Sequence, residues 1–125
     1  MCVRDDALLL IQRGTEPGKG LWSLPGGRVE LGETMAEAVV REFQEEVGLD
    51  AVCGPLVGWV ERISTAFHFA IFDFVVTLLG DVGASTTPVA GDDADAAEFV
   101  ALHEITDRPL VSGLAEFLTT HGIVA

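Results

Sequence analysis

Three glutamates, Glu42, Glu45 and Glu46, have the spacing of a cation-binding stripe on one face of a helix. At about 100° per helical residue they span an arc of roughly 100°, while the apolar residues around them gather on a different arc. Like charges three and four residues apart repel and weaken a helix. A sequence that keeps these glutamates together therefore indicates that they bind a cation, which offsets their repulsion. Clustered carboxylate oxygens suit Mg²⁺ or Mn²⁺.

The residues around this stripe follow a longer pattern, which is Gly, five residues, Glu, seven residues, Arg-Glu, two residues, Glu-Glu, one residue, Gly and an aliphatic residue. The positions that match are Gly27, Glu33, Arg41, Glu42, Glu45, Glu46, Gly48 and Leu49. The pattern resembles the Nudix box. In that family the residue after Arg-Glu is usually Ile, Leu or Val, and Phe43 at this position is a minor departure. The preceding segment Gly20–Gly27 is similar to the family's approach to the box.

The resemblance implies roles for the metal-binding residues. In Nudix enzymes the equivalents of Glu42 and Glu46 hold the metal, and Glu45 shares ligation or helps to activate water. A main-chain carbonyl at the position of Gly26 also reaches the metal. The expected cofactor is accordingly Mg²⁺ or Mn²⁺.

Arg41 and Glu33 are expected to support this catalytic group. The resemblance implies that Arg41 ties the carboxylate cluster to Glu33, a task that suits the planar fork of a guanidinium. The alternative is an exposed arginine that merely pairs with Gln44 or Glu45. We expect structural support from Arg41 and Glu33 rather than direct chemistry.

Basic residues are scarce and unevenly placed. Arg13, Lys19 and Arg28 are three of only seven lysines and arginines, and all three lie before or at the box. This bias favours contacts with substrate phosphates, although each residue taken singly is more often an ordinary surface charge. Arg13, between a predicted strand and the loop after it, is the best candidate of the three.

A second group of acids follows far along the chain, at Asp92, Asp93, Asp95 and Glu98. Many members of the family use a loop carboxylate here as a base or as an extra metal ligand. The alternative is a polar surface loop, and the sequence does not single out one residue. Asp92 and Asp93 are the candidates for substrate binding.

Aromatic residues offer two readings. Trp22 and the pair Phe67 and Phe69 could stack on a nucleobase, but aromatic side chains more often fill a core, and core packing is the prediction here. His68 lies in the same aromatic segment, where a structural role is predicted.

The elements that must position these residues can be read from local signals. Thr34 and Glu37 form a capping box that starts a helix, and Gly48 ends it. A second helix is expected over Ser112–His121, capped by Ser112 and stopped at Gly122. The expected strands are Val3–Arg4 and Leu8–Ile11 around an Asp5-Asp6 turn, Trp22–Leu24, Leu56–Ile63, Phe67–Leu79 and Glu98–Leu102, with loops over Thr15–Gly20 and Gly83–Asp95.

This order of strands and helices predicts an α/β fold. The resemblance implies a Nudix-type α/β/α sandwich with a mixed sheet and a catalytic loop-helix-loop, in a single domain over residues 1–125. A short first strand and a mean hydropathy of +0.40 leave apolar surface to cover, so a homodimer is also expected.

Composition narrows the class of protein. A net charge of −13 argues against nucleic acid as a partner, since phosphate backbones are bound by a surplus of Lys and Arg. Cys2 and Cys53 form no disulfide framework, and no apolar run reaches the length of a membrane span. We expect a cytoplasmic protein that acts on a small nucleotide.

The expected reaction is hydrolysis of a nucleoside diphosphate linked to another moiety. The segments His68–Leu79 and Pro88–Ala94 resemble the ADP-ribose pyrophosphatase-like branch of the family, which would give AMP and ribose 5-phosphate. One alternative is a nucleoside triphosphate pyrophosphohydrolase that removes damaged nucleotides. Another alternative is a catalytically silent binding domain. Such a domain would tolerate the loss of the acidic residues of the box, whereas this chain retains all of them.

Overall fold

The computed structural model describes residues 1–79 and 88–124, and its central feature is a four-stranded sheet. Strand β2 (Ala7–Arg13) pairs antiparallel with β1 (Val3–Arg4), β3 (Trp22–Ser23) and β6 (Ala94–Ala101). An isolated parallel bridge joins Trp22 to Leu110. Among the described residues, the pairs between named strands of this sheet are antiparallel, and the predicted mixed character is confined to this parallel bridge.

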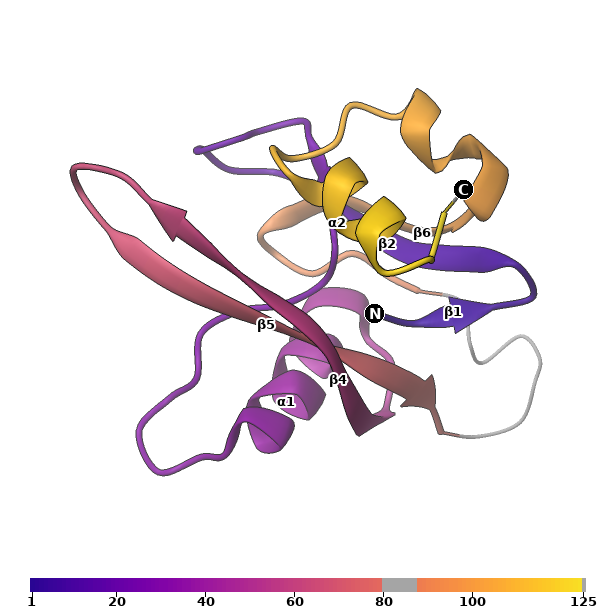
Figure 1. Ribbon diagram of the computed structural model, residues 1–125. Coiled ribbons are helices and arrows are strands. Elements are labelled where there is room, and N and C mark those ends of the chain that lie inside the picture. Colours follow the sequence, from indigo (N-terminus) through magenta and orange to yellow (C-terminus); the bar gives the residue numbers. More distant parts are fainter. Residues whose placement is uncertain (80–87, 125) are drawn as a thin grey trace.

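Helices cover the two faces of β2, as Figure 1 shows for α1 (Met35–Val47) and α2 (Leu114–Thr120). Leu8 and Leu10 pack with the residues of α2, whereas Leu9 and Ile11 pack with those of α1. Successive side chains of a strand point to opposite faces, so four consecutive apolar residues bury both faces of β2. This arrangement confirms the predicted α/β/α sandwich.

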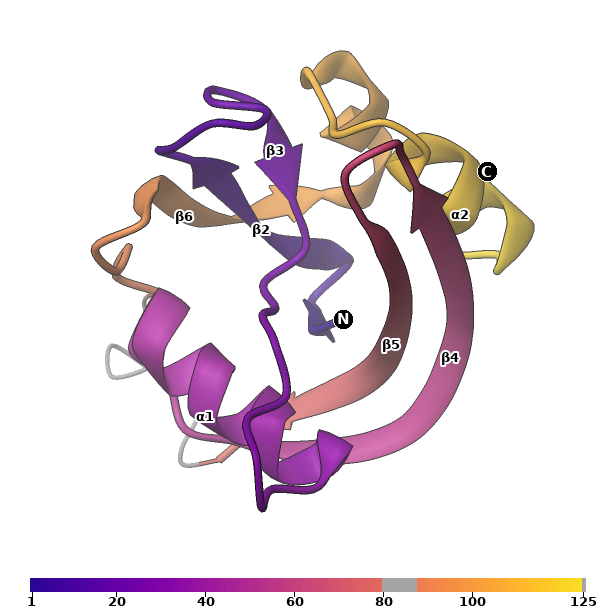
Figure 2. The same ribbon diagram turned by 90° about the vertical axis from the view of Figure 1, so that its left-hand side faces the viewer.

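Strands β4 (Ala51–Ile63) and β5 (His68–Leu78) form a separate two-stranded antiparallel sheet. The hairpin is long and curved, and its concave side faces the segment between β3 and α1 (Figure 2). The prediction that β4 begins at Leu56 was wrong. Gly54 and Pro55 are residue types that usually interrupt a strand. Here the pairing of β4 with β5 continues past them, with shifts of register between Cys53 and Leu56 and between Leu56 and Gly58.

The predictions for the C-terminal third were partly wrong. β6 begins at Ala94 rather than Glu98, because pairing with β2 overrides the weak strand preference of alanine. The 3₁₀ helix η2 (Leu102–Asp107) follows directly. The last helix is capped by Gly113, at φ 85°, and not by Ser112. Residues 83–87 of the predicted loop lie outside the described residues.

The helix that carries the box begins and ends as predicted. The Thr34 hydroxyl accepts from the Glu37 N–H (3.1 Å), and the Glu37 carboxylate accepts from the Thr34 N–H (2.9 Å). Gly48 ends the helix at φ 69°, a conformation that costs glycine little. None of the helices in the described residues is long and apolar enough to cross a membrane.

Candidate active site

Two carboxylates of α1 meet the glycine loop that precedes the helix. The backbone N–H of Gly26 donates to Glu46 Oε2 (2.7 Å). The Glu42 carboxylate lies so close to Gly27 that a Cβ at this position would overlap it. Glu42 and Glu46 are one helical turn apart, and both reach the Gly26-Gly27 backbone. The absence of a side chain at Gly27 makes this approach possible.

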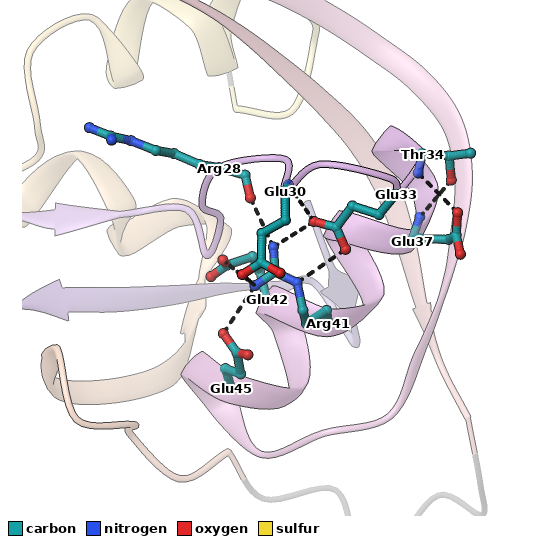
Figure 3. A network of polar contacts seen from close by, with 8 residues as sticks. All are labelled: Arg28, Glu30, Glu33, Thr34, Glu37, Arg41, Glu42 and Glu45. Carbon is teal, nitrogen blue, oxygen red and sulfur yellow. Dashed lines mark hydrogen bonds and ion pairs between the residues drawn. The ribbon is translucent and has the colours of Figure 1, made fainter.

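Arg41 connects three acidic residues of the box, Glu33, Glu42 and Glu45 (Figure 3). Its Nε and Nη2 donate to the two oxygens of Glu33 (3.2 and 2.7 Å). Its Nη1 donates to Glu42 (2.7 Å) and Glu45 (3.2 Å). Nη2 also donates to the main-chain carbonyl of Arg28 (2.8 Å). One guanidinium therefore fixes the helix, the loop and three carboxylates relative to one another.

The ionisation of this network follows from its contacts. The Arg41 hydrogen bonds, with help from the Glu30 N–H, lower the pKa of Glu33. The same bonds from Glu33 and Glu42 raise the pKa of Arg41. Both groups therefore remain charged. Sequence reasoning missed Glu30, whose N–H donates to Glu33 (2.7 Å) and whose carboxylate lies 3.6 Å from Arg41 Nη1. The only available signal was an acid three residues before Glu33.

Glu46 has a different electrostatic environment. Burial raises the pKa of its carboxyl to about 7, and the negative charges of Glu42 and Asp93 add to this shift. The Gly26 N–H and the charge of Arg13 oppose it. Glu46 is thus the point where acidic groups of α1 and of the segment before β6 come together.

The segment before β6 is held against the end of α1 by its backbone. The Gly91 N–H donates to the Glu46 carbonyl (2.8 Å), and the Gly14 N–H donates to the Asp93 carbonyl (3.0 Å). A Cβ at Gly91 would overlap the carbonyl oxygen of Glu45. These contacts place Asp93 beside the acidic cluster, with the exposed Asp92 next to it in sequence.

The basic residues predicted for substrate binding have different surroundings. Arg13 ends β2 near Glu46, and its Nε donates to the Pro17 carbonyl (2.8 Å). Arg28 points away from the acidic network in Figure 3, and its guanidinium carbon lies 5.3 Å from the centre of the Phe69 ring. Lys19 lies on the exposed loop after β2.

Glu98 is held in a pair away from the box. Arg108 donates to both of its oxygens (2.7 and 3.1 Å) and stacks on Trp22, with its guanidinium carbon 4.6 Å from the ring centre. The pair lowers the pKa of Glu98. Among the acids after the β4–β5 hairpin, the geometry therefore favours Asp93 over Glu98 as a contributor to the site.

The two predictions of aromatic core packing had different outcomes. Trp22 is buried in the core cluster that contains Leu8 and Leu10, as predicted. Core packing of Phe67 and Phe69 was wrong, because both rings are exposed and stack on each other. The hairpin extends beyond the sandwich, so these residues have no helix to cover them.

The chemistry of the acidic cluster fits a hard divalent cation. Glu42 and Glu46 both supply carboxylate oxygens beside the glycine loop, Glu42 at Gly27 and Glu46 at the Gly26 N–H. In the described residues, however, no three acidic, histidine or cysteine side chains form one tight group. Arg41 holds Glu42 and Glu45, while the Gly26 N–H holds Glu46.

Residues 1–120 match the family model described as the NUDIX domain. Over 102 residues the chain is 40% identical to an ADP-ribose pyrophosphatase of Methanocaldococcus jannaschii, which covers 82% of this chain and 59% of that protein. Over 60 residues it is 42% identical to a CTP pyrophosphohydrolase of Escherichia coli, which covers 47% of this chain and 44% of that protein.

The fold is similar to the crystal structure of a MutT Nudix hydrolase from Burkholderia pseudomallei. The TM-score is 0.77 at 30% identity, with 94% of this chain and 93% of that chain covered. The chain spans 59% of the archaeal relative and 44% of the bacterial one. On the match of the family model and the shared fold, the chain belongs to the Nudix family.

Proposed function

We propose that the protein is a divalent-metal-dependent pyrophosphohydrolase that cleaves the diphosphate of a nucleoside diphosphate linked to another moiety. One observation carries this proposal: the carboxylates of Glu42 and Glu46 both meet the Gly26-Gly27 loop, in a helix whose Arg41 is tied to Glu33. Clustered carboxylates of this kind suit a cation that itself binds phosphate oxygens.

Glu42, Glu45, Glu46 and the carbonyl of Gly26 would hold Mg²⁺ or Mn²⁺. When bound, such an ion offsets the phosphate charge and lowers the pKa of water. Glu45 is the most exposed of the three side chains, at 59%. It is therefore the residue best placed to take a proton from the attacking water.

The remaining residues position this group. Arg41 and Glu33 would keep the carboxylates aimed at the loop, as partners outside a metal site commonly do. Arg13, beside Glu46 at the end of β2, would contact a phosphate oxygen through a charge-assisted hydrogen bond. Lys19 and Arg28 would contribute positive charge on the approach to the site.

The preferred substrate is ADP-ribose, which would give AMP and ribose 5-phosphate. Support comes from the 40% identity to the archaeal ADP-ribose pyrophosphatase. Asp92 and Asp93 could accept hydrogen bonds from the terminal ribose, whereas a γ-phosphate would be repelled by their charge. The relative that hydrolyses CTP favours a second candidate, a nucleoside triphosphate pyrophosphohydrolase. A silent binding domain is least supported, because the chain retains every acid of the box.

The metal assignment is tested with Glu46→Gln, which removes ligand charge and preserves shape. We expect kcat to fall by about 100-fold or more, and wild-type activity to vanish in excess EDTA. Glu116→Gln, an exposed glutamate of α2, is the matched control and should keep full activity. Near-wild-type turnover by Glu46→Gln, or full activity in EDTA, would contradict the assignment.

The substrate assignment is tested by measuring kcat/KM at fixed Mg²⁺ for ADP-ribose, other nucleotide sugars and nucleoside triphosphates. We expect ADP-ribose to have the highest value. If dGTP or an oxidised form of dGTP is turned over at least as efficiently, the triphosphate pyrophosphohydrolase replaces ADP-ribose hydrolysis as the function.

A further inference from the structure

Two phenylalanine rings are stacked in solvent at the start of β5. The ring centres of Phe67 and Phe69 are 4.8 Å apart, with 25° between the planes. Their residues are 41% and 40% exposed. A pair of rings that leaves this much apolar surface in water offers a flat face to an aromatic ligand.

Arg28 connects this stack to the acidic cluster. Its guanidinium carbon lies 5.3 Å from the centre of the Phe69 ring, and its main-chain carbonyl accepts from Arg41 Nη2 (2.8 Å). Arg41 in turn donates to Glu42 (2.7 Å). Two residues, Arg28 and Arg41, thus link the aromatic stack to the carboxylates that are proposed to act on the diphosphate.

The strand register places the stack on the inner face of the hairpin. Phe69 lies opposite Arg62, and Ile71, on the same face, lies opposite Val60. Val60 packs against the core, and Arg62 donates to the Ser112 carbonyl of the main body. Figure 2 shows this concave side of the hairpin facing the segment that carries Arg28.

We propose that Phe67 and Phe69 form the subsite for the nucleobase of the substrate and that Arg28 covers it when no substrate is bound, a proposal that rests on the function proposed above. Every base has a π-face, and stacking on an aromatic side chain is favourable whatever the base. A base between two planes needs roughly 7 Å, twice a carbon–carbon contact. The guanidinium at 5.3 Å leaves less room, so the base displaces it from Phe69.

This subsite has a consequence for specificity. Stacking reads the area of a base and not the hydrogen-bonding groups at its edges. The protein should therefore accept different bases, with purines favoured over pyrimidines by their larger rings. The main-chain carbonyl of Arg28 accepts from Arg41, so a displaced Arg28 side chain still starts from the loop that carries the box.

The test compares Phe69→Leu with Phe72→Leu. Both residues lie on β5, with exposures of 40% and 38%, and both stack on another aromatic ring. Phe72, however, lies opposite Trp59 on the outer face. Binding of AMP and of ribose 5-phosphate is measured by calorimetry in Mg²⁺, since both carry a phosphate and only AMP carries a base.

We expect Phe69→Leu to weaken AMP binding about tenfold and to leave ribose 5-phosphate binding unchanged. Phe72→Leu should alter neither. GMP should respond to Phe69→Leu as AMP does. In hydrolysis assays, Phe69→Leu should raise KM for ADP-ribose and change kcat little, because the base does not react.

Unchanged AMP binding by Phe69→Leu would overturn the subsite, as would equal losses for AMP and ribose 5-phosphate, or equal losses in the two variants. The binding arm does not depend on turnover. A wild-type protein that hydrolyses no phosphoanhydride, yet binds AMP in a manner sensitive to Phe69, would refute the proposed function and support the subsite.

Discussion

At the scale of single residues, Arg41 holds together carboxylates that would otherwise repel one another. It contacts Glu33, Glu42 and Glu45 within 3.2 Å, and Glu30 lies 3.6 Å away. A lysine would keep the charge, but its ammonium group lacks the planar fork that engages several carboxylates in fixed directions. The geometry of the guanidinium, and not only its charge, therefore matters for the site.

Arg41→Lys should lower kcat by roughly 10–100-fold, the usual cost of losing a partner that orients metal ligands. Arg4→Lys is the matched control, because Arg4 pairs loosely with the exposed Asp5 (3.7 Å), and it should keep full activity. If Arg41 and Glu33 act as a pair, adding Glu33→Gln to Arg41→Lys costs less than the two single losses combined. Strictly multiplicative losses would show that the residues act separately.

Glu46 makes the metal-free protein sensitive to pH. Its folded pKa is about 7, against an ordinary value of 4.5. Between these values the unfolded chain is ionised while the folded protein keeps the proton, so the free energy of unfolding falls as pH rises through this window. Above pH 7 ionised Glu46 lowers the free energy of unfolding by its full amount, up to about 3 kcal/mol.

Urea unfolding in EDTA at pH 5 and pH 8 measures this effect. We expect the wild type to lose more stability than Glu46→Gln between the two values, and the difference between the proteins isolates Glu46 from other titrating groups. Excess Mg²⁺ should reduce the stability that the wild type loses at pH 8, because a ligand that binds only the folded state stabilises that state. An identical pH dependence in the two proteins would contradict the prediction.

At the scale of elements, the loop-helix-loop depends on a close approach between backbone and side chain. A methyl group at Gly27 would overlap the Glu42 carboxylate, whereas one at Gly26 would meet open space within 4 Å. Both residues lie in the same loop, so general loop strain affects them alike. Gly27 is therefore the position where the lack of a side chain lets the Glu42 carboxylate reach the loop.

Gly27→Ala should reduce kcat by at least tenfold, since Glu42 must move by more than a small adjustment. Gly26→Ala should lose much less, because its backbone N–H and carbonyl are retained. Circular dichroism establishes that both variants fold. Equal activity in the two variants would mean that the Glu42 contact with the loop is not needed for turnover.

At the scale of the whole molecule, the outer face of the β4–β5 hairpin leaves apolar side chains uncovered. Trp59 is 54% exposed and Ile63 is 71% exposed, and both lie on this face. A second copy presents the same face, so a two-fold pairing would cover both at once. This surface adds to the reasons for expecting a homodimer.

Light scattering at micromolar concentration should give the mass of a dimer. Trp59→Lys places charge on the outer face and should shift the mass towards the monomer. Arg4→Lys keeps the charge of a residue on β1 and should leave the mass unchanged. A monomeric mass for the wild type would reject the prediction.

The helix that carries the box was determined by the sequence alone, for a local physical reason. The capping box of Thr34 and Glu37, the end at Gly48 and the stripe of Glu42, Glu45 and Glu46 depend on residues three or four positions apart. Residues three or four positions apart become neighbours as soon as the segment forms a helix, so their contacts follow from the sequence without help from the rest of the fold. The α/β/α arrangement was predicted from the order of strands and helices and from the family resemblance, and the four consecutive apolar residues of β2, buried on both faces, explain it physically.

Only the tertiary structure decided which distant residues join the site. Asp93 lies beside Glu46 because backbone hydrogen bonds hold its loop against the end of α1. Phe67 and Phe69 remain exposed because the hairpin curves beyond the sandwich. No spacing in the chain encodes these neighbours. They depend on how β4 pairs with β5 and β6 with β2, and non-local pairing is set by the packing of the whole fold.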